Sequence, residues 1–243
     1  MANFKVYIDA GHGFGDAGVD PGAVGNGLKE ADVTLTVAEL LADMLKARGL
    51  AVRVNRKRGD KTGLGLNGRI NDANACGADI YISIHFNSAA GTAGTGFEIF
   101  YYSGGGKSKE LAVAIEGLVK AKFTSRGIKT GMPGTTGEFG VIRLTKMPAV
   151  LAEGAFINNP SDAAKMKDQG WLKWLAECYG KGICKVLGVK WDTSAQPPKP
   201  PAPPPAPGKV YRVQVGAYNV KANAEAMVKK LKALGVDAFV TES

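Results

Sequence analysis

The chain has 243 residues, enough for one sizeable α/β core and a small second unit. A hydrophobic fraction of 45% and a mean hydropathy of −0.06 indicate a soluble globular protein, and no apolar run approaches the ~18–20 residues of a membrane span. The net charge of +9 favours a polyanionic environment, which is nucleic acid, an anionic membrane or a phosphate-bearing wall polymer. Charge alone does not choose among these three.

Neither a leader sequence nor cysteine chemistry is indicated. The first residues enter an apolar strand directly and lack the basic, apolar and small-residue sections of a secretory signal. We therefore expect synthesis in the cytosol, with another route of release if the protein acts outside. The three cysteines, Cys76, Cys178 and Cys184, have no C-x-x-C spacing, which predicts reduced packing residues.

Strands and helices alternate along the first 190 residues. The predicted strands are 4–9, 50–55, 80–87, 96–102, 141–144 and 148–152. The predicted helices are 28–45, 66–76, 108–123 and a long helix through Trp171 to Ile183, with Ser161 or Asp162 as its N-cap. This order predicts a mostly parallel twisted sheet with helices on both faces.

Three segments between these elements are rich in glycine or in basic residues. Gly13–Gly27 is predicted to be either an active loop or a disordered one, and Gly127–Gly140 a flexible rim. The basic run Arg53, Arg56, Lys57 and Arg58 is interpreted as a solvated face.

The composition changes at Gln196–Gly208, a proline-rich stretch that predicts an extended polyproline spacer. We expect a catalytic unit at 1–190, a linker at 191–208 and a small module at 209–243. In that module a strand at 211–218, a helix at 222–234 and a strand at 236–241 make one βαβ unit. Such a unit is below the ~40 residues that usually stand alone, so it should form a homodimer or begin a longer module.

The chain has two histidines, His12 and His85, and each lies where the apolar run of a predicted strand ends. Strand exits of a parallel sheet meet at one edge, where open α/β folds bind their ligands. With Glu30 from the first turn of the next helix, these residues suit a catalytic zinc that keeps its fourth position for water. Each has an ordinary alternative, because a histidine is often a packed residue and Glu30 also suits the helix dipole.

Glu153 ends another predicted strand and should reach the same edge of the sheet. A carboxylate beside zinc that is not itself a ligand supplies a general base and acid. Its alternative is an exposed loop carboxylate. Asp9, Asp16 and Asp20 compete for these roles, and Asp9 alternatively orients His12.

Five motifs in order resemble the zinc-dependent N-acetylmuramoyl-L-alanine amidases of the amidase-3 family: Asp9-Ala-Gly-His12-Gly, Gly27-Leu-Lys-Glu30, Leu66-x-x-Arg69-x-x-x-x-Asn74, Ser83-Ile-His85-x-Asn87 and Pro148-Ala-Val-Leu-Ala-Glu153. The resemblance covers most of Phe4–Val189. It implies that His12, Glu30 and His85 bind zinc (Zn2+) and that Glu153 is the catalytic carboxylate. The bond cut would join N-acetylmuramic acid to L-alanine. One departure is that Glu153-Gly-Ala-Phe stands where the family usually has Glu-x-Gly-Phe.

The tail, through Tyr211-Arg-Val-Gln-Val-Gly-Ala-Tyr, resembles half of a sporulation-related (SPOR) repeat, a module that binds peptidoglycan glycan strands. Both parts together resemble a mother-cell lytic amidase or a phage endolysin, which act on the wall after lysis or holin-type release. The rivals are another zinc peptidase or deacetylase acting on wall fragments, and a non-catalytic binding protein. Nucleic acid is disfavoured as a partner because the basic residues are scattered and no recognition motif is present.

Overall fold

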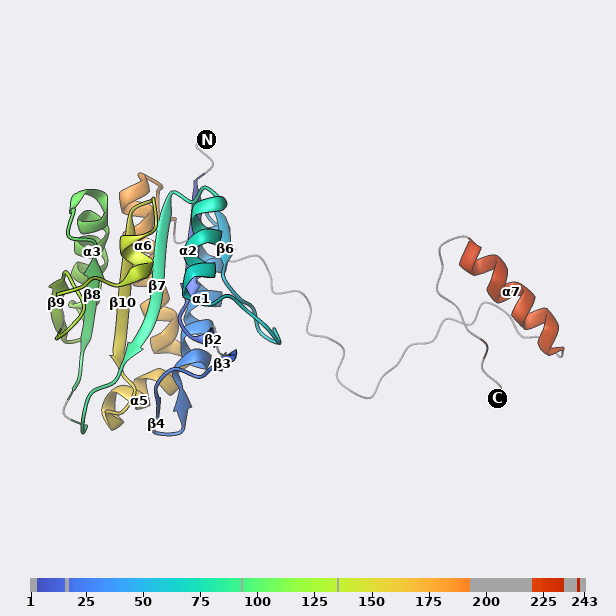
Figure 1. Cartoon of the computed structure of the whole chain (residues 1–243), viewed down its shortest axis with the longest axis horizontal. Coiled ribbons are helices and arrows are strands. Elements are labelled where there is room, and N and C mark those ends of the chain that lie inside the picture. Colours follow the sequence, from blue (N-terminus) through green and yellow to red (C-terminus); the bar gives the residue numbers. More distant parts are fainter. Residues whose placement is uncertain are drawn as a thin grey trace. The chain divides into compact units, whose positions relative to one another are not determined.

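The computed structural model describes residues 4–15, 18–92, 94–134, 136–192, 220–233 and 240 (Figure 1). The chain divides into two compact units, Met1–Lys199 and Pro200–Ser243, which are described separately. The first unit holds a six-stranded sheet in the order β6-β1-β7-β10-β8-β9. Its strands are β1 (Lys5–Ala10), β6 (Ala51–Val54), β7 (Ile80–Asn87), β8 (Phe97–Tyr101), β9 (Ser125–Lys129) and β10 (Ala149–Phe156).

All neighbouring strands of this sheet run parallel except β10 and β8, which are antiparallel. Helices α1 (Glu30–Lys46), α3 (Gly106–Val119) and α6 (Gln169–Leu187) supply the larger apolar cluster. Helices α2 (Leu66–Ala75) and α4 (Gly140–Arg143) supply the smaller cluster, which contains the residues of alternate strand positions. The prediction of a mostly parallel sheet with helices on both faces is confirmed.

Strand β7 shows how the two clusters divide the side chains of one strand. Ile80, Ile82 and Ile84 belong to the larger cluster, whereas Tyr81 belongs to the smaller one. Successive side chains of a strand point to opposite faces, so His85 emerges on the side of the smaller cluster, at the carboxyl end of the strand. The apolar run therefore sets both the position and the direction of this histidine.

Two strand predictions near the end of the sheet are wrong in detail. Residues 141–143 belong to helix α4, whose Val141 and Ile142 are buried in the smaller cluster, and Leu144 is the C-cap of this helix. A short apolar run does not distinguish a buried strand from one turn of helix, which explains the error. Strand β10 continues to Phe156, so Glu153 lies inside the strand and not at its exit.

The glycine-rich segment before α1 forms two small hairpins. They pair β2 (Gly13–Gly15) with β3 (Gly18–Asp20) and β4 (Val24–Gly25) with β5 (Leu28–Lys29). The second glycine-rich segment, predicted to be a rim, starts within β9.

The last helix of the first unit is preceded by a separate helix, α5 (Pro160–Lys167). Asn159 caps α5, because its side chain accepts hydrogen bonds from the backbone amides of the two residues predicted as N-caps, Ser161 and Asp162. Asp162 instead turns inward and accepts hydrogen bonds from the backbone amides of Gly96 and Phe156.

In the second unit, α7 (Lys221–Ala233) confirms the predicted helix. The predicted strands at 211–218 and 236–241 lie outside the described residues, apart from Val240 at one position, and so does the proline-rich linker. Among the helices that are described, none combines the length and the apolar character needed to cross a bilayer.

Candidate active site

His12 lies in the turn that follows β1, close against the end of β7. The amide of Gly11 donates a hydrogen bond to the carbonyl of Ile84 at 3.0 Å, and His12 itself has a φ of 60°. A Cβ atom at Gly11 would lie 2.5 Å from the imidazole of His85. Glycine at this position therefore allows the two histidine-bearing segments to approach each other.

Glu30 is the first residue of α1 and is only 3% exposed. Its Oε2 accepts a hydrogen bond from the amide of Ala23 at 2.9 Å, and its Oε1 accepts one from the amide of Phe86 at 3.0 Å. The carboxylate is thus fixed by the loop before the helix and by strand β7.

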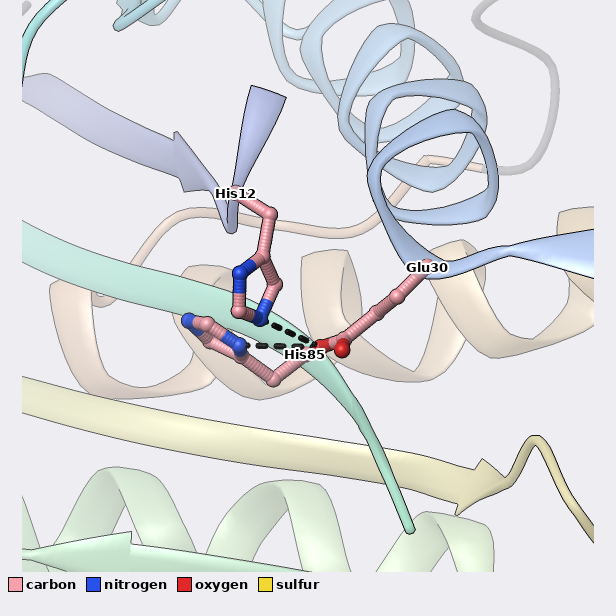
Figure 2. A group of neighbouring side chains, drawn as sticks. All are labelled: His12, Glu30 and His85. Carbon is pink, nitrogen blue, oxygen red and sulfur yellow. Dashed lines mark hydrogen bonds and ion pairs between the residues drawn. The ribbon is translucent and has the colours of Figure 1, made fainter. Parts of the chain in front are cut away.

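The structure brings His12, Glu30 and His85 together (Figure 2). The Nε2 atom of His12 lies 3.1 Å from Glu30 Oε1, and the Nδ1 atom of His85 lies 3.0 Å from the same oxygen. One ligand atom from each residue lies within 4.8 Å of the others. Two imidazole nitrogens and a carboxylate oxygen are the donor set of a catalytic zinc site, so the residues fit this ion.

The outer nitrogen of His12 is held by Asp20, whose Oδ2 lies 2.8 Å from Nδ1. This contact orients the ring so that Nε2 faces Glu30. Asp9, the alternative proposed from sequence, has a different position: it is fully buried and accepts hydrogen bonds from the hydroxyls of Tyr81 and Ser83. Asp16 lies outside the described residues.

The three groups shift one another's proton affinity. Burial lowers the pKa of His12, but the hydrogen bonds to Glu30 and Asp20 outweigh it and raise this pKa to about 9. Burial raises the pKa of Glu30, but the hydrogen bonds to both imidazoles outweigh it and bring this pKa well below its usual range. A metal ion would therefore compete with protons for the imidazole nitrogens.

Glu153 lies in register with His85 on β7 and with Glu98 on β8. Its Oε2 is buried and has no hydrogen-bond partner among the described residues. Burial raises its pKa to about 7, opposed by His85 and reinforced by the negative charges of Glu30 and Glu98. A half-buried acid with one buried oxygen free of partners and a pKa near neutrality can either accept or donate a proton there.

Comparison with known proteins identifies the family. Residues 6–185 match the amidase-3 family, N-acetylmuramoyl-L-alanine amidase, and residues 207–243 match the SPOR domain. The chain belongs to the N-acetylmuramoyl-L-alanine amidase family. It is an N-acetylmuramoyl-L-alanine amidase by this relationship, and the resemblance read from its motifs is confirmed.

Relatives extend over nearly the whole amidase chain. It is 35% identical over 239 residues to the sporulation-specific N-acetylmuramoyl-L-alanine amidase of Bacillus subtilis (strain 168), covering 97% of this chain and 84% of the relative. It is 34% identical over 255 residues to the endolysin of Bacillus phage SPP1, covering 97% of this chain and 89% of the endolysin.

Solved structures of other amidases match a large part of this chain. The catalytic domain of CwlV from Bacillus (Paenibacillus) polymyxa has 34% identity and a TM-score of 0.67, covering 77% of this chain and 99% of that domain. The N-acetylmuramoyl-L-alanine amidase of Clostridium difficile 630 has 32% identity and a TM-score of 0.69, covering 78% of this chain and 100% of that structure.

The departure of this amidase from the family motif after Glu153 has a packing explanation. A Cβ atom on Gly154 would lie 2.7 Å from the ring of Phe86, so the first position after Glu153 has no room for a side chain. Ala155 is fully buried in the larger cluster. Glycine and alanine are therefore accommodated in this order because Phe86 lies against the backbone of Gly154.

Sequence reasoning missed two arginines that hold the site. Arg56 is only 8% exposed and donates hydrogen bonds to the backbone around His12, so its interpretation as a solvated residue was wrong. Arg69 donates from Nη2 to the carbonyls of His12 and Phe14, both at 2.8 Å. Arg69 belongs to the motif Leu66-x-x-Arg69-x-x-x-x-Asn74, but nothing in the sequence indicates that either arginine holds the backbone around His12.

Proposed function

We propose that this amidase hydrolyses the bond between N-acetylmuramic acid and L-alanine with zinc held by His12, Glu30 and His85, and with Glu153 as general base and acid. The observation that carries this proposal is the buried, unpartnered Oε2 of Glu153 next to the convergent donor set. A polar atom in that state costs free energy unless a ligand supplies its partner, which favours a role in the reaction.

The chemistry needs one proton to move twice. Zinc, when bound, polarises the scissile carbonyl and makes water acidic enough to react near neutral pH. Glu153 takes the proton of the attacking water as the new carbon–oxygen bond forms. It then delivers this proton to the L-alanine nitrogen as the carbon–nitrogen bond breaks. A pKa of about 7 suits both steps.

We also propose three parts for the whole chain: a catalytic unit at 1–190, a linker at 191–208 and a wall-binding module at 209–243. The match of residues 207–243 to the SPOR domain supports a role of this module in holding the enzyme on peptidoglycan. Action on the wall after lysis or holin-type release remains part of the proposal. Pairing of the module with a second copy stays a prediction, which the solution mass of the full chain tests.

The test of the catalytic proposal compares Glu153→Gln with wild type on purified cell walls. We expect wild type to release new L-alanine amino termini, and the variant to lose at least ~100-fold in rate, because general base catalysis contributes that much. The variant should keep one zinc per chain, whereas His85→Ala should lose it. The exposed Glu110→Gln serves as a matched control and should keep the wild-type rate.

The same digests separate the alternatives. New amino termini from other residues indicate a peptidase, and released acetate indicates a deacetylase. Wall binding with no new end group indicates a binding protein. A wild-type rate in Glu153→Gln would refute the role of Glu153.

A further inference from the structure

A buried carboxylate beside Glu153 holds two basic side chains. Glu98, which is 2% exposed, lies directly across from Glu153 in the β8–β10 pair. Its Oε2 accepts hydrogen bonds from Arg126 Nε at 2.9 Å and from Lys129 Nζ at 2.5 Å. Its Oε1 accepts one from the side-chain amide of Asn87. Both oxygens of Glu98 thus have hydrogen-bond partners within the protein.

The two basic side chains keep charge and hydrogen-bond donors that Glu98 does not take up. Two positive charges face one negative charge, so the cluster keeps one net positive charge. The side chains of Arg126 and Lys129 are 42% and 35% exposed. Within the described part of the chain, Nη1 and Nη2 of Arg126 make no hydrogen bond, and Lys129 Nζ has donors beyond its bond to Glu98. Solvent-facing donors therefore remain for an anionic ligand.

The position of these donors is fixed before any ligand binds. Arg126 is held by Glu98 and also by the ring of Phe156, whose centroid lies 5.0 Å from its Cζ atom. Lys129 Nζ lies 5.8 Å from the ring centroid of Phe100. Holding flexible side chains in place beforehand reduces the entropy lost on binding. The pair therefore has the properties of a prepared anion site.

The cluster lies beside the catalytic groups on the same face of the sheet. His85, Glu153 and Glu98 are register partners on three adjacent strands. Adjacent strands are about 4.8 Å apart, so Glu98 lies roughly 5 Å from Glu153 and roughly 10 Å from His85 across the sheet. Arg126 and Lys129 come from β9, one strand further from the reacting groups, and their charged atoms reach back to the Glu98 carboxylate. Two residues of an extended peptide span roughly 7 Å. A group on the residue after L-alanine can thus reach the pair when the scissile bond is at Glu153.

We infer that Arg126 and Lys129 bind the free carboxylate of the stem-peptide residue that follows L-alanine. In peptidoglycan this residue is a glutamate linked through its γ-carboxyl group, and its α-carboxyl group is either free or converted to an amide. The basic pair makes the enzyme selective for the free acid. The inference rests on the proposed function, because it assumes that the lactyl–alanine bond is the one cut.

The experiment uses two soluble disaccharide–tetrapeptide fragments that are identical except for an α-carboxylate or an α-carboxamide on this glutamate. We expect wild type to cleave the acid with a kcat/KM at least ~10-fold above that of the amide, as for a charge-assisted pair. Lys129→Met and Arg126→Gln should lose this preference, because their kcat/KM falls for the α-carboxylate fragment and stays unchanged for the α-carboxamide fragment. Lys129→Arg should retain most of it. Lys107→Met, an exposed lysine on α3, is the control.

The outcomes separate this inference from the proposed function. An equal loss on both substrates in Lys129→Met would show that the pair only neutralises Glu98, and would overturn the inference. Equal wild-type cleavage of the two fragments would overturn it as well, while new L-alanine termini from both would leave the proposed function standing. No new L-alanine terminus from either fragment would overturn both.

Discussion

Arg56 provides the strongest test of how the site is held together. Its guanidinium joins the turn that carries His12 to the helix that begins with Glu30. It is 8% exposed, and among the described residues it hydrogen-bonds only to uncharged oxygens. Its Nε donates a hydrogen bond to Ala10 O at 3.1 Å. Its Nη2, with two N–H groups, lies 2.9, 2.7 and 3.0 Å from three acceptors, Gly11 O, Ala31 O and Thr34 Oγ1.

The loss of stability expected when Arg56 is replaced follows from these contacts. Hydrogen bonds to a charged group contribute about 1.5–3 kcal/mol each. Nη2 has two N–H groups for three acceptors, so the four contacts are equivalent to three bonds, which would contribute about 4.5–9 kcal/mol before any cost is subtracted. Burying a guanidinium with no carboxylate partner costs several kcal/mol in return. Arg56→Met keeps most of the volume but removes these donors. Among the described residues, Ala10 O then keeps only its side-chain bond from Asn55 Nδ2, and Gly11 O and Ala31 O share the single proton of the Thr34 hydroxyl. We expect its free energy of unfolding to fall by about 3–5 kcal/mol.

The assay is urea unfolding of the full chain with a chelator present, so that metal binding does not contribute. The matched control is Arg58→Met, two residues along the same basic run, where a 60% exposed side chain pairs with Glu39. An exposed pair is worth less than about 1 kcal/mol. If Arg56→Met and Arg58→Met lowered the free energy of unfolding by the same small amount, Arg56 would not be the link between the His12 turn and helix α1.

Three further predictions concern the site and its frame. Asp20→Ala should weaken zinc binding about 10–100-fold, because the His12 ring loses its orienting partner; competition with a chelator measures this, and unchanged affinity would contradict it. The rate of zinc-saturated enzyme should fall as pH decreases below about 7, because Glu153 must be ionised to act as a base. A nearby cation favours the ionised form, so the measured midpoint should lie at or below that value, and a rate that rose towards acid pH would argue against the assignment. Asn159→Ala removes the cap of α5 and should cost about 1 kcal/mol in urea unfolding, a loss that Lys173→Ala on the exposed side of α6 should not show.

The convergence of the site was predictable because it follows from strand topology. His12 follows β1 and His85 lies near the carboxyl end of β7, and the two strands turned out to be parallel neighbours with both carboxyl ends at one edge. Glu30 was predictable for a similar reason, since the first turn of a helix that follows such a strand lies at the same edge. These inferences needed only the order of the elements and their direction.

The supporting charges were not predictable in the same way. Four basic residues lie between positions 53 and 58, and nothing in the run distinguishes Arg56, which turns inward, from Arg58, which remains exposed. The deciding factor is the set of carbonyls presented by two distant segments. Glu98 is similar, because its strand supplies only an alternating pattern. The cations beside Glu98, Arg126 and Lys129, come from β9, and nothing in the sequence of β8 indicates that β9 is its neighbour.

The register of β10 links the fold to the chemistry. Val150 and Ala152 belong to the larger apolar cluster, so Leu151 and Glu153 point to the opposite face. A slip of one residue would direct Glu153 into the apolar cluster, far from His85 and Glu98, and would bring two apolar side chains to the reactive edge. A carboxylate without partners there would cost several kcal/mol. The apolar core of this strand and the position of its acid are therefore specified by the same alternation, and a variant cannot move one without moving the other.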